Sequence, residues 1–416
     1  MTKRLMACVL MLVALTDNAA AQPSDVLALS AADYDRFVKH VTEITEIPAP
    51  PFKEAARAAY YADRLREAGL KDVEVDPEGN VMGLRHGTGG GKLLVLAAHL
   101  DTVFPEGTPI KVRREGDKLF APGIGDDSAG LASLLVWLDV MRTNEIRTRD
   151  DILFVGTVGE EGAGNLRGVR YLFNKGKYNG RIKAFIAIDG TDVTRIVNTA
   201  VGSKRYKINF EGPGGHSYGA FGIVNPMAAA ADTISALYRT GVPAKPKTTY
   251  AASVISGGTS VNAIPDSVIV EIDLRSSDPN ELARLEQRLK AIVEQSVAAE
   301  NAARSLLTGV VSSTTELTGD RPAGSIADNA PLPALAAATI MKFGLSPRFE
   351  ASSNDANIPL GLGIPAIGIS AGGGGGRTHS LDEYLDIEPE ATNKALSIGL
   401  DIVLAAAGRV DPASPP

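Results

Sequence analysis

The chain has 416 residues, of which 44% are hydrophobic and 22% are charged, a balance typical of a globular protein large enough for two domains. Its formal net charge of −7, with no cluster of lysines and arginines, argues against nucleic acid as a partner. The single cysteine, Cys8, lies in the first 21 residues. A chain without that segment has no disulfide, no thiolate ligand and no cysteine nucleophile.

The first 21 residues have the pattern of a secretory signal peptide. Lys3 and Arg4 give a charged start, Leu5–Leu15 is a short apolar run, and Ala19–Ala21 forms a small-residue cleavage site before Gln22. The apolar run is too short to span a bilayer. We therefore expect a secreted or periplasmic protein that begins at Gln22 and has no membrane partner after cleavage.

Residues 22–202 alternate between helical and strand patterns. The composition predicts helices over Phe52–Ala68 and Ser128–Met141. Three continuous apolar runs of strand length predict buried strands, over Lys92–Ala98, Asp151–Val158 and Lys183–Ile188. This alternation favours an α/β domain with a doubly wound, mostly parallel sheet and helices on both faces.

The pattern changes after Gly202, where strands acquire one polar face. Apolar and polar residues alternate in Lys204–Phe210 and Ser267–Leu274, as is typical of antiparallel strands with one solvated face. Helices are predicted nearby, over Pro226–Tyr238 and Asn280–Ala298. We interpret residues 203–318 as an inserted α+β lid or dimerisation domain.

The earlier pattern resumes near Pro331. A helix is predicted over Pro331–Phe343 and a buried strand over Ala366–Ile369. The catalytic domain is therefore expected to consist of two parts, residues 22–202 and 319–416, on either side of the lid.

Residue types that bind divalent metals follow the ends of the predicted buried strands. His99 and Asp101 end the first strand, Glu160 and Glu161 the second, and Asp189 the third. Because the carboxyl ends of parallel strands meet at one edge of a sheet, we expect these side chains to lie together. Asp126, in a turn that opens a helix, and His379, after a glycine-rich loop, complete the series.

The spacing within this series suggests separate roles. His99 and Asp101 lie two residues apart and share a face, so His99 can bind a metal while Asp101 supports its ring. Glu160 and Glu161 point opposite ways in an extended chain, so one can bind metal while the other reaches a metal-bound water. Asp126, which alone reads as a capping turn, can also bridge two cations. Imidazoles with carboxylates suit zinc best, with cobalt or manganese as alternatives.

The order and spacing of these motifs resemble the dizinc exopeptidases and amidohydrolases related to carboxypeptidase G, peptidase T, acetylornithine deacetylase and aminoacylase. The resemblance covers roughly Ile47–Ala407. It implies two zinc ions per subunit and assigns the residues as follows: His99 and Asp189 to one zinc, Glu161 and His379 to the other, Asp126 as the bridge, Asp101 as the support of His99, and Glu160 as the general base.

The resemblance extends to the insert. His216, in Gly214–Ser217, resembles the lid histidine that reaches the partner's active site in dimeric members, although a histidine beside two glycines is more often a loop residue. Asn262 resembles a substrate-contacting asparagine. Arg275 resembles a carboxylate-binding arginine, with Arg321 as a second candidate, although unpaired arginines are usually surface residues. A guanidinium suits a bidentate grip on a substrate carboxylate.

Two positions depart from the family pattern without touching a proposed ligand. Ser128 stands where the family often has lysine, and Ser353–Asn357 lacks the glycine of the Gly-Thr-Asp-Ala loop of relatives. Both changes are expected to act on the specificity pocket.

The sequence thus predicts an enzyme that cleaves amide bonds with metal-activated water and Glu160 as the base. The first interpretation is a secreted exopeptidase for short peptides, forming a homodimer through the lid. The alternative is an N-acyl-amino-acid amidohydrolase. A third, from another class, is a catalytically silent peptide-binding protein, which would be expected to have lost ligands or the base.

Overall fold

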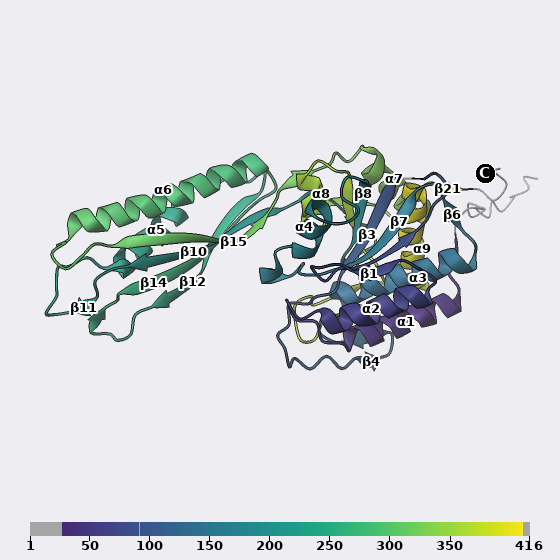
Figure 1. Cartoon of the computed structure of the whole chain (residues 1–416), viewed down its shortest axis with the longest axis horizontal. Helices are drawn as coiled ribbons and strands as arrows, with labels where there is room; N and C mark the ends of the chain where they lie inside the picture. Colours follow the sequence, from purple (N-terminus) through teal and green to yellow (C-terminus); the bar gives the residue numbers. More distant parts are fainter. Residues whose placement is uncertain (1–26, 91, 411–416) are drawn as a thin grey trace, which may run out of the picture.

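The structure, a computed structural model, describes residues 27–90 and 92–410. The predicted signal segment, residues 1–21, lies outside these ranges. Figure 1 shows a rounded larger part and an elongated lid that extends from it. Within the described ranges, no helix is long and apolar enough to cross a membrane.

The larger part is built on a nine-stranded sheet in the order β1-β2-β7-β3-β8-β18-β9-β16, with β17 beside β9. Its four central strands are parallel: β7 (Asp151–Thr157), β3 (Leu93–His99), β8 (Ile182–Ile188) and β18 (Ala366–Ile369). The flanking strands are β1 (Val73–Val75), β2 (Val81–Arg85), β9 (Arg195–Ala200), β16 (Gly324–Ser325) and β17 (Arg348–Ser352). The predicted fold class, α/β with a mostly parallel sheet, is confirmed.

Helices cover both faces of this sheet. One face carries α1 (Ala31–Thr45), α2 (Ala55–Glu67), α3 (Ala129–Thr143), α7 (Pro331–Lys342) and α9 (Pro389–Ala407), and the other carries α4 (Arg167–Asn174) and α8 (Asn357–Gly361). Leu94 and Leu96 of β3 pack into the first core, whereas Leu93 and Val95 pack into the second. Burial on both faces explains why the central strands are continuous apolar runs.

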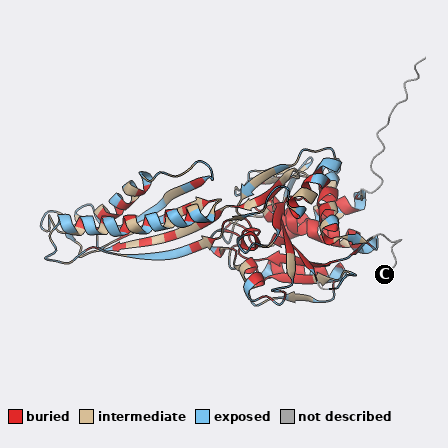
Figure 2. Cartoon of the chain, turned by 90° about the horizontal axis from the view of Figure 1, so that it is seen from above, coloured by how far each residue is buried: buried red, intermediate tan, exposed pale blue. Residues whose placement is uncertain are grey.

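The lid is a four-stranded antiparallel sheet in the order β12-β14-β10-β15. The strands are β12 (Thr248–Gly257), β14 (Ser267–Ser276), β10 (Gly202–Glu211) and β15 (Ser312–Arg321). Alternate residues of β10 and β14, including Tyr206, Ile208 and Phe210, pack against α5 (Pro226–Tyr238) and α6 (Pro279–Ala303). Figure 2 shows that the buried residues concentrate in the larger part, while the outside of the lid is mostly exposed or intermediate.

Smaller elements complete the chain. A short ribbon, β11 (Gly215–His216) with β13 (Ala263–Ile264), lies at the tip of the lid farthest from the large sheet (Figure 1). A small sheet pairs β4 (Arg113–Glu115), β5 (Lys118–Phe120), β20 (Tyr384–Asp386) and β19 (Gly375–Gly376), and β6 (Arg147–Thr148) pairs with β21 (Arg409–Val410). Single helical turns occur at Ile124–Ser128 and Gly162–Gly164.

Candidate metal centre and active-site cavity

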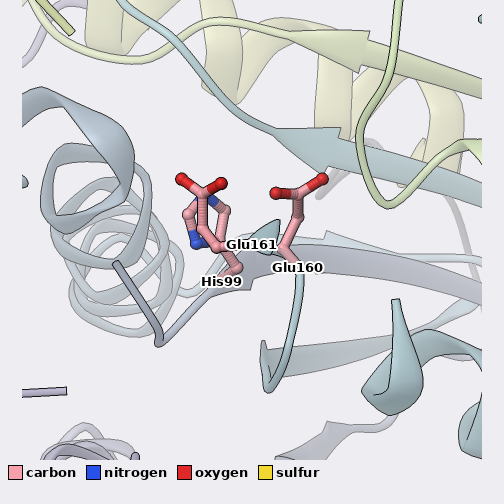
Figure 3. A group of neighbouring side chains, drawn as sticks. All are labelled: His99, Glu160 and Glu161. Atoms are coloured by element: carbon pink, nitrogen blue, oxygen red, sulfur yellow. The ribbon is translucent and has the colours of Figure 1, made fainter. Parts of the chain in front are cut away.

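Three neighbouring strands deliver the metal-type residues to one edge of the large sheet. His99 is the last residue of β3, Glu160 and Glu161 follow β7, and Asp189 follows β8. Because the strand order is β7-β3-β8, these ends are adjacent, as parallel strands require. Figure 3 shows His99, Glu160 and Glu161 projecting to the same side of this edge.

Two groups of potential metal ligands share the carboxylate of Asp126. The first is His99, Asp126 and Asp189, and the second is Asp126, Glu161 and His379, with ligand atoms in each group within 4.8 Å of one another. Oδ1 of Asp126 lies 2.8 Å from Nε2 of His99, and its Oδ2 lies 3.1 Å from Nε2 of His379. Each oxygen therefore faces a different histidine, which is the arrangement that a bridging carboxylate needs.

The backbone of Asp101 fixes the ring of His99. Nδ1 of His99 donates to the carbonyl oxygen of Asp101 at 2.9 Å, so the lone pair of a neutral imidazole lies on Nε2, which faces Asp126. The Asp101 carboxylate instead accepts the amides of Glu160 at 3.0 Å and Glu161 at 2.7 Å. Oδ1 of Asp101 lies 3.8 Å from Nδ1 of His99, so the carbonyl oxygen makes the hydrogen bond to the ring, and the carboxylate holds the amides of the two glutamates.

The donor set of this centre fits two divalent metals. Hydrogen bonds with Asp126 and Glu161 raise the pKa of His379 to about 10. Burial, followed by the charge of Asp126, raises the pKa of Asp189 to about 6. These groups bind protons tightly because negative charge is crowded at the centre. Divalent cations would neutralise the same charge, so the centre favours their binding. The donors are nitrogen and oxygen only, which suits zinc, cobalt or manganese.

Glu160 has a different environment from its neighbour Glu161. Its carboxylate accepts Nη1 of Arg321 at 2.8 Å, and the same nitrogen contacts Oγ of Ser353 at 3.0 Å. Burial raises the pKa of Glu160 well above its ordinary value, although Arg321 and His99 oppose that shift. Glu161 lies 3.0 Å from Nε2 of His379 instead. The two adjacent acids therefore contact different partners, and only Glu161 contacts a histidine of the second ligand group.

A cavity of about 480 Å³ lies over the centre and is lined by four arginines. Arg275 donates from Nε to Asp273 at 2.6 Å, while Nε of Arg205 lies 3.5 Å from the other oxygen of Asp273. Two guanidinium groups thus share one carboxylate. Arg195 also lines the cavity but pairs with Glu350, 3.1 Å away. Together with Arg321, which is engaged with Glu160, these arginines form what we call the basic wall, in a lining that also contains the carboxylates of the metal centre.

Arg195 and Arg205 were not among the predicted site residues. The alternation of Lys204–Phe210 places Arg205 on the face opposite Tyr206, but the sequence does not reveal what lies beside it. Only the register of β10 on β14, in which Arg205 is opposite Asp273, brings it to the cavity. No signal in the sequence distinguished Arg195.

His216 and Asn262 lie together in a separate place. They line a cavity of about 520 Å³ at the tip of the lid, which shares no lining residue with the cavity over the metal centre. His216 is exposed, and its Nδ1 accepts the amides of Tyr218 and Gly219 at 3.2 Å. Within one chain, the structure does not bring these two predicted substrate contacts to the metal centre.

The fold and the centre together define a hydrolase scaffold of the two-metal type, with a lid inserted between its ligands. The comparison with known families agrees. Residues 95–405 match the model of peptidase family M20/M25/M40. The chain belongs to this family, which confirms the predicted resemblance and the predicted class of enzyme, a metallopeptidase-type hydrolase of amide bonds.

Individual relatives match over part of their length. Carboxypeptidase G2 of Pseudomonas sp. strain RS-16 is 28% identical over 225 residues, 53% of this chain and 52% of the relative. A succinyl-diaminopimelate desuccinylase of Leptothrix cholodnii is 27% identical over 246 residues, 55% of this chain and 63% of the relative. The chain thus spans less than two thirds of the length of these curated relatives.

Solved structures match over nearly their whole length. A tripeptidase from Staphylococcus aureus has a TM-score of 0.75 at 25% identity, covering 90% of this chain and 98% of that one. A dinuclear metal binding peptidase of the M20 family from Bacillus subtilis has a TM-score of 0.66 at 16% identity, covering 91% and 99%. The second likeness shows the fold.

Proposed function

We propose that the protein is a secreted or periplasmic two-metal exopeptidase that cleaves short peptides. The observation that carries this proposal is Asp126, whose two oxygens face different histidines beside the buried carboxylate of Glu160. An N-acyl-amino-acid amidohydrolase is the second candidate, because the same centre serves both reactions. Relatives named as a carboxypeptidase and as desuccinylases support the two readings equally. Secretion rests on the predicted signal segment.

The geometry suggests a role for each residue of the centre. His99 with Asp189 would hold one metal, Glu161 with His379 the other, and Asp126 both. When bound, such metals supply Lewis acidity and lower the pKa of water. Glu160 takes the proton of the attacking water and passes it to the leaving amine. Zinc is the proposed metal, with cobalt and manganese as alternatives.

The basic wall of the cavity favours a substrate with a free carboxylate. Arg321 is buried and engaged with Glu160 and Ser353. Arg275 contacts Asp273 through Nε, and its side chain is 38% exposed, so we assign the carboxylate grip to Arg275. Arg205 adds a second guanidinium to the same wall, and Asp273 neutralises only one of the two. A guanidinium holds a carboxylate through two parallel hydrogen bonds. This anchor serves peptides and N-acyl amino acids alike.

The proposed function is tested with the zinc-reconstituted protein and a panel of dipeptides, tripeptides and N-acyl amino acids. We expect hydrolysis of the short peptides, and a loss of roughly 10- to 100-fold in kcat/KM when the carboxyl terminus is amidated. Cleavage of N-acyl amino acids alone would favour the deacylase. Metal binding without hydrolysis of any amide would leave only the silent binding protein.

Arg275→Gln tests whether Arg275 binds the substrate carboxylate without taking part in the chemical step. It should raise KM for substrates with a free carboxylate roughly 10- to 100-fold, with little change in kcat. For amidated substrates, KM of the variant should stay close to that of the wild type, because these substrates lack the group that Arg275 binds. Arg284→Gln is the matched control: Arg284 is a lid arginine paired with Glu281 at 2.8 Å and is absent from the cavity lining.

We further propose that the lid forms a homodimer in which His216 serves the partner's active site. The strand β11, which contains His216, lies at the end of the lid away from β3, β7 and β8, whose ends carry the metal centre (Figure 1). Large exposed side chains lie near it in the chain: Tyr218 is 89% exposed and Phe221 85%, and Val261, next to Asn262, is fully exposed. An apolar tip of this kind is typical of an interaction surface, and a partner subunit would cover it.

Mixing two inactive variants tests this arrangement. His216→Ala and Glu160→Gln homodimers should each lose most activity, since one lacks an oxyanion donor and the other the base. In a mixed dimer, one active site combines the intact His216 of one subunit with the intact Glu160 of the other. Activity should therefore return to roughly half the wild-type level per mixed dimer. No recovery on mixing, with dimers verified by light scattering, would contradict an exchange of His216.

A further inference from the structure

Glu383 connects the segment that carries one proposed metal ligand to the loop that carries another. It follows His379 by four residues and is only 1% exposed. Its Oε1 accepts the amides of Gly125 at 2.8 Å and Asp126 at 2.9 Å, and its Oε2 accepts the amide of Gly123 at 3.0 Å. One buried carboxylate therefore holds three backbone amides of the Asp126 loop.

These contacts are additional to the docking of the two backbones. The strand β20 already pairs with β5 through Tyr384 and Phe120, and the carbonyl oxygen of Glu383 accepts the amide of Ala121 at 3.1 Å. The segment would thus lie beside the loop without the carboxylate. The side chain adds hydrogen bonds to the residues that aim Asp126, and charged acceptors make such bonds strong.

The other side of the loop is fixed to His99. Asp127 accepts the amide of His99 at 2.9 Å and that of Gly130 at 3.2 Å. Asp126 is therefore held between two carboxylates. Asp127 contacts the strand that ends at His99, and Glu383 belongs to the segment that carries His379. The position of its two oxygens relative to His99 and His379 depends on both.

We infer that Glu383 is a positioning residue that sets the Asp126 carboxylate between the two metals. This inference rests on the proposed role of Asp126 as the bridging ligand. Glu383 lies behind the loop and is absent from the lining of the cavity over the centre, so it acts through Asp126 and does not touch the substrate.

The test replaces the carboxylate by its isosteric amide. In Glu383→Gln, one of the three backbone amides faces an NH₂ group in place of an oxygen. Residues that hold metal ligands in place typically change metal affinity 10- to 100-fold when mutated. We therefore expect a loss of roughly that size in the affinity for Zn²⁺ by calorimetry, and a changed visible spectrum on titration with Co²⁺. The melting temperature of the metal-free protein should fall by only a few degrees, because one buried N–H then opposes another, so metal affinity can be measured on folded protein.

Two further variants make the result decisive. Glu388→Gln is the control, because Glu388 also accepts two backbone amides, those of Glu390 at 3.1 Å and Ala391 at 2.6 Å, at the start of α9. It should leave metal affinity unchanged. Gly125→Ala approaches from the other side: a Cβ there would lie 3.1 Å from Oε1 of Glu383 and 3.3 Å from Cγ2 of Thr191. It should displace the carboxylate and weaken metal binding too.

The outcomes are distinguishable. Wild-type protein that binds no metal would overturn the proposed function itself. Wild-type protein that binds two metals, with unchanged affinity in both Glu383→Gln and Gly125→Ala, would overturn only the role of Glu383. An equal loss in Glu388→Gln would also overturn it. If Glu383→Gln fails to fold, the affinity and Co²⁺ spectrum of Gly125→Ala decide.

Discussion

Glu160→Gln is expected to lower kcat by about 10²- to 10⁴-fold, the usual contribution of a general base, while both metals stay bound. The amide has the shape of the carboxylate, and its oxygen can still accept Nη1 of Arg321, which lies 2.8 Å from Oε1. The side chain therefore keeps its place but can no longer take a proton. Turnover on a peptide that the wild type cleaves, together with metal content by mass spectrometry, checks this result.

Glu161→Gln, one residue further on, is the contrast. Its oxygen lies 3.0 Å from Nε2 of His379, in the second ligand group, so this variant should lose metal as well as turnover. The distinction matters because His99, Glu160 and Glu161 also form a close group of potential ligands. If Glu160→Gln released metal as Glu161→Gln does, Glu160 would be a ligand and the base would lie elsewhere.

The central strands could be predicted from the sequence to within a residue or two. The predicted strand Lys92–Ala98 is observed as Leu93–His99, because burial on both faces leaves a continuous apolar run that few other structures produce. The helix predicted from Phe52 begins only at Ala55, since Phe52 has a positive φ of 67°. Its first residues form a turn, and composition alone does not reveal that boundary.

Helix α1 is among the helices that were not predicted, although its signal is present. In α1, Phe37, Val41 and Ile44 are buried at helical spacing, and Ser30 with Asp33 forms a capping box. The pattern lies close to the predicted signal segment and before the first predicted helix, where we assigned no element. Helix α6 is longer than predicted and ends at Ala303 rather than Ala298, because good helix formers continue past the predicted end.

The candidate site could be predicted only where the local sequence pattern determines the position of a residue in the fold. Each strand end could be matched with a ligand type, so the sequence could indicate that His99, Glu160, Glu161 and Asp189 lie at one edge. It could not show that the Asp101 carboxylate turns to the amides of the two glutamates. Nor could it show that Glu383 holds the Asp126 loop, because such contacts join residues more than 250 positions apart.

Asp126→Asn is expected to have the broadest effect on the centre, because its carboxylate belongs to both ligand groups. One of its oxygens would become an NH₂ group, which cannot bind a cation and would face His99 or His379. Metal content should fall below two per chain. Turnover should fall by at least about 10²-fold, the upper end of the loss in activity when a residue that only supports a ligand is mutated.

Asp127→Asn, the adjacent position, shows whether this effect belongs to the bridge or to the loop. Asp127 is fully buried, more so than Asp126, and accepts the backbone amides of His99 and Gly130. It is absent from the cavity lining. An amide there would oppose one N–H donor with another and should lower the free energy of unfolding by about 1–3 kcal/mol, measured by thermal melting of the metal-free protein. At saturating Zn²⁺ the metal content should still reach two per chain, because Asp127 supplies no ligand, although the affinity should fall as in Glu383→Gln because Asp127 also holds the loop. If instead Asp127→Asn emptied the centre and Asp126→Asn did not, the bridging carboxylate would be Asp127, and the facing histidines would need another explanation.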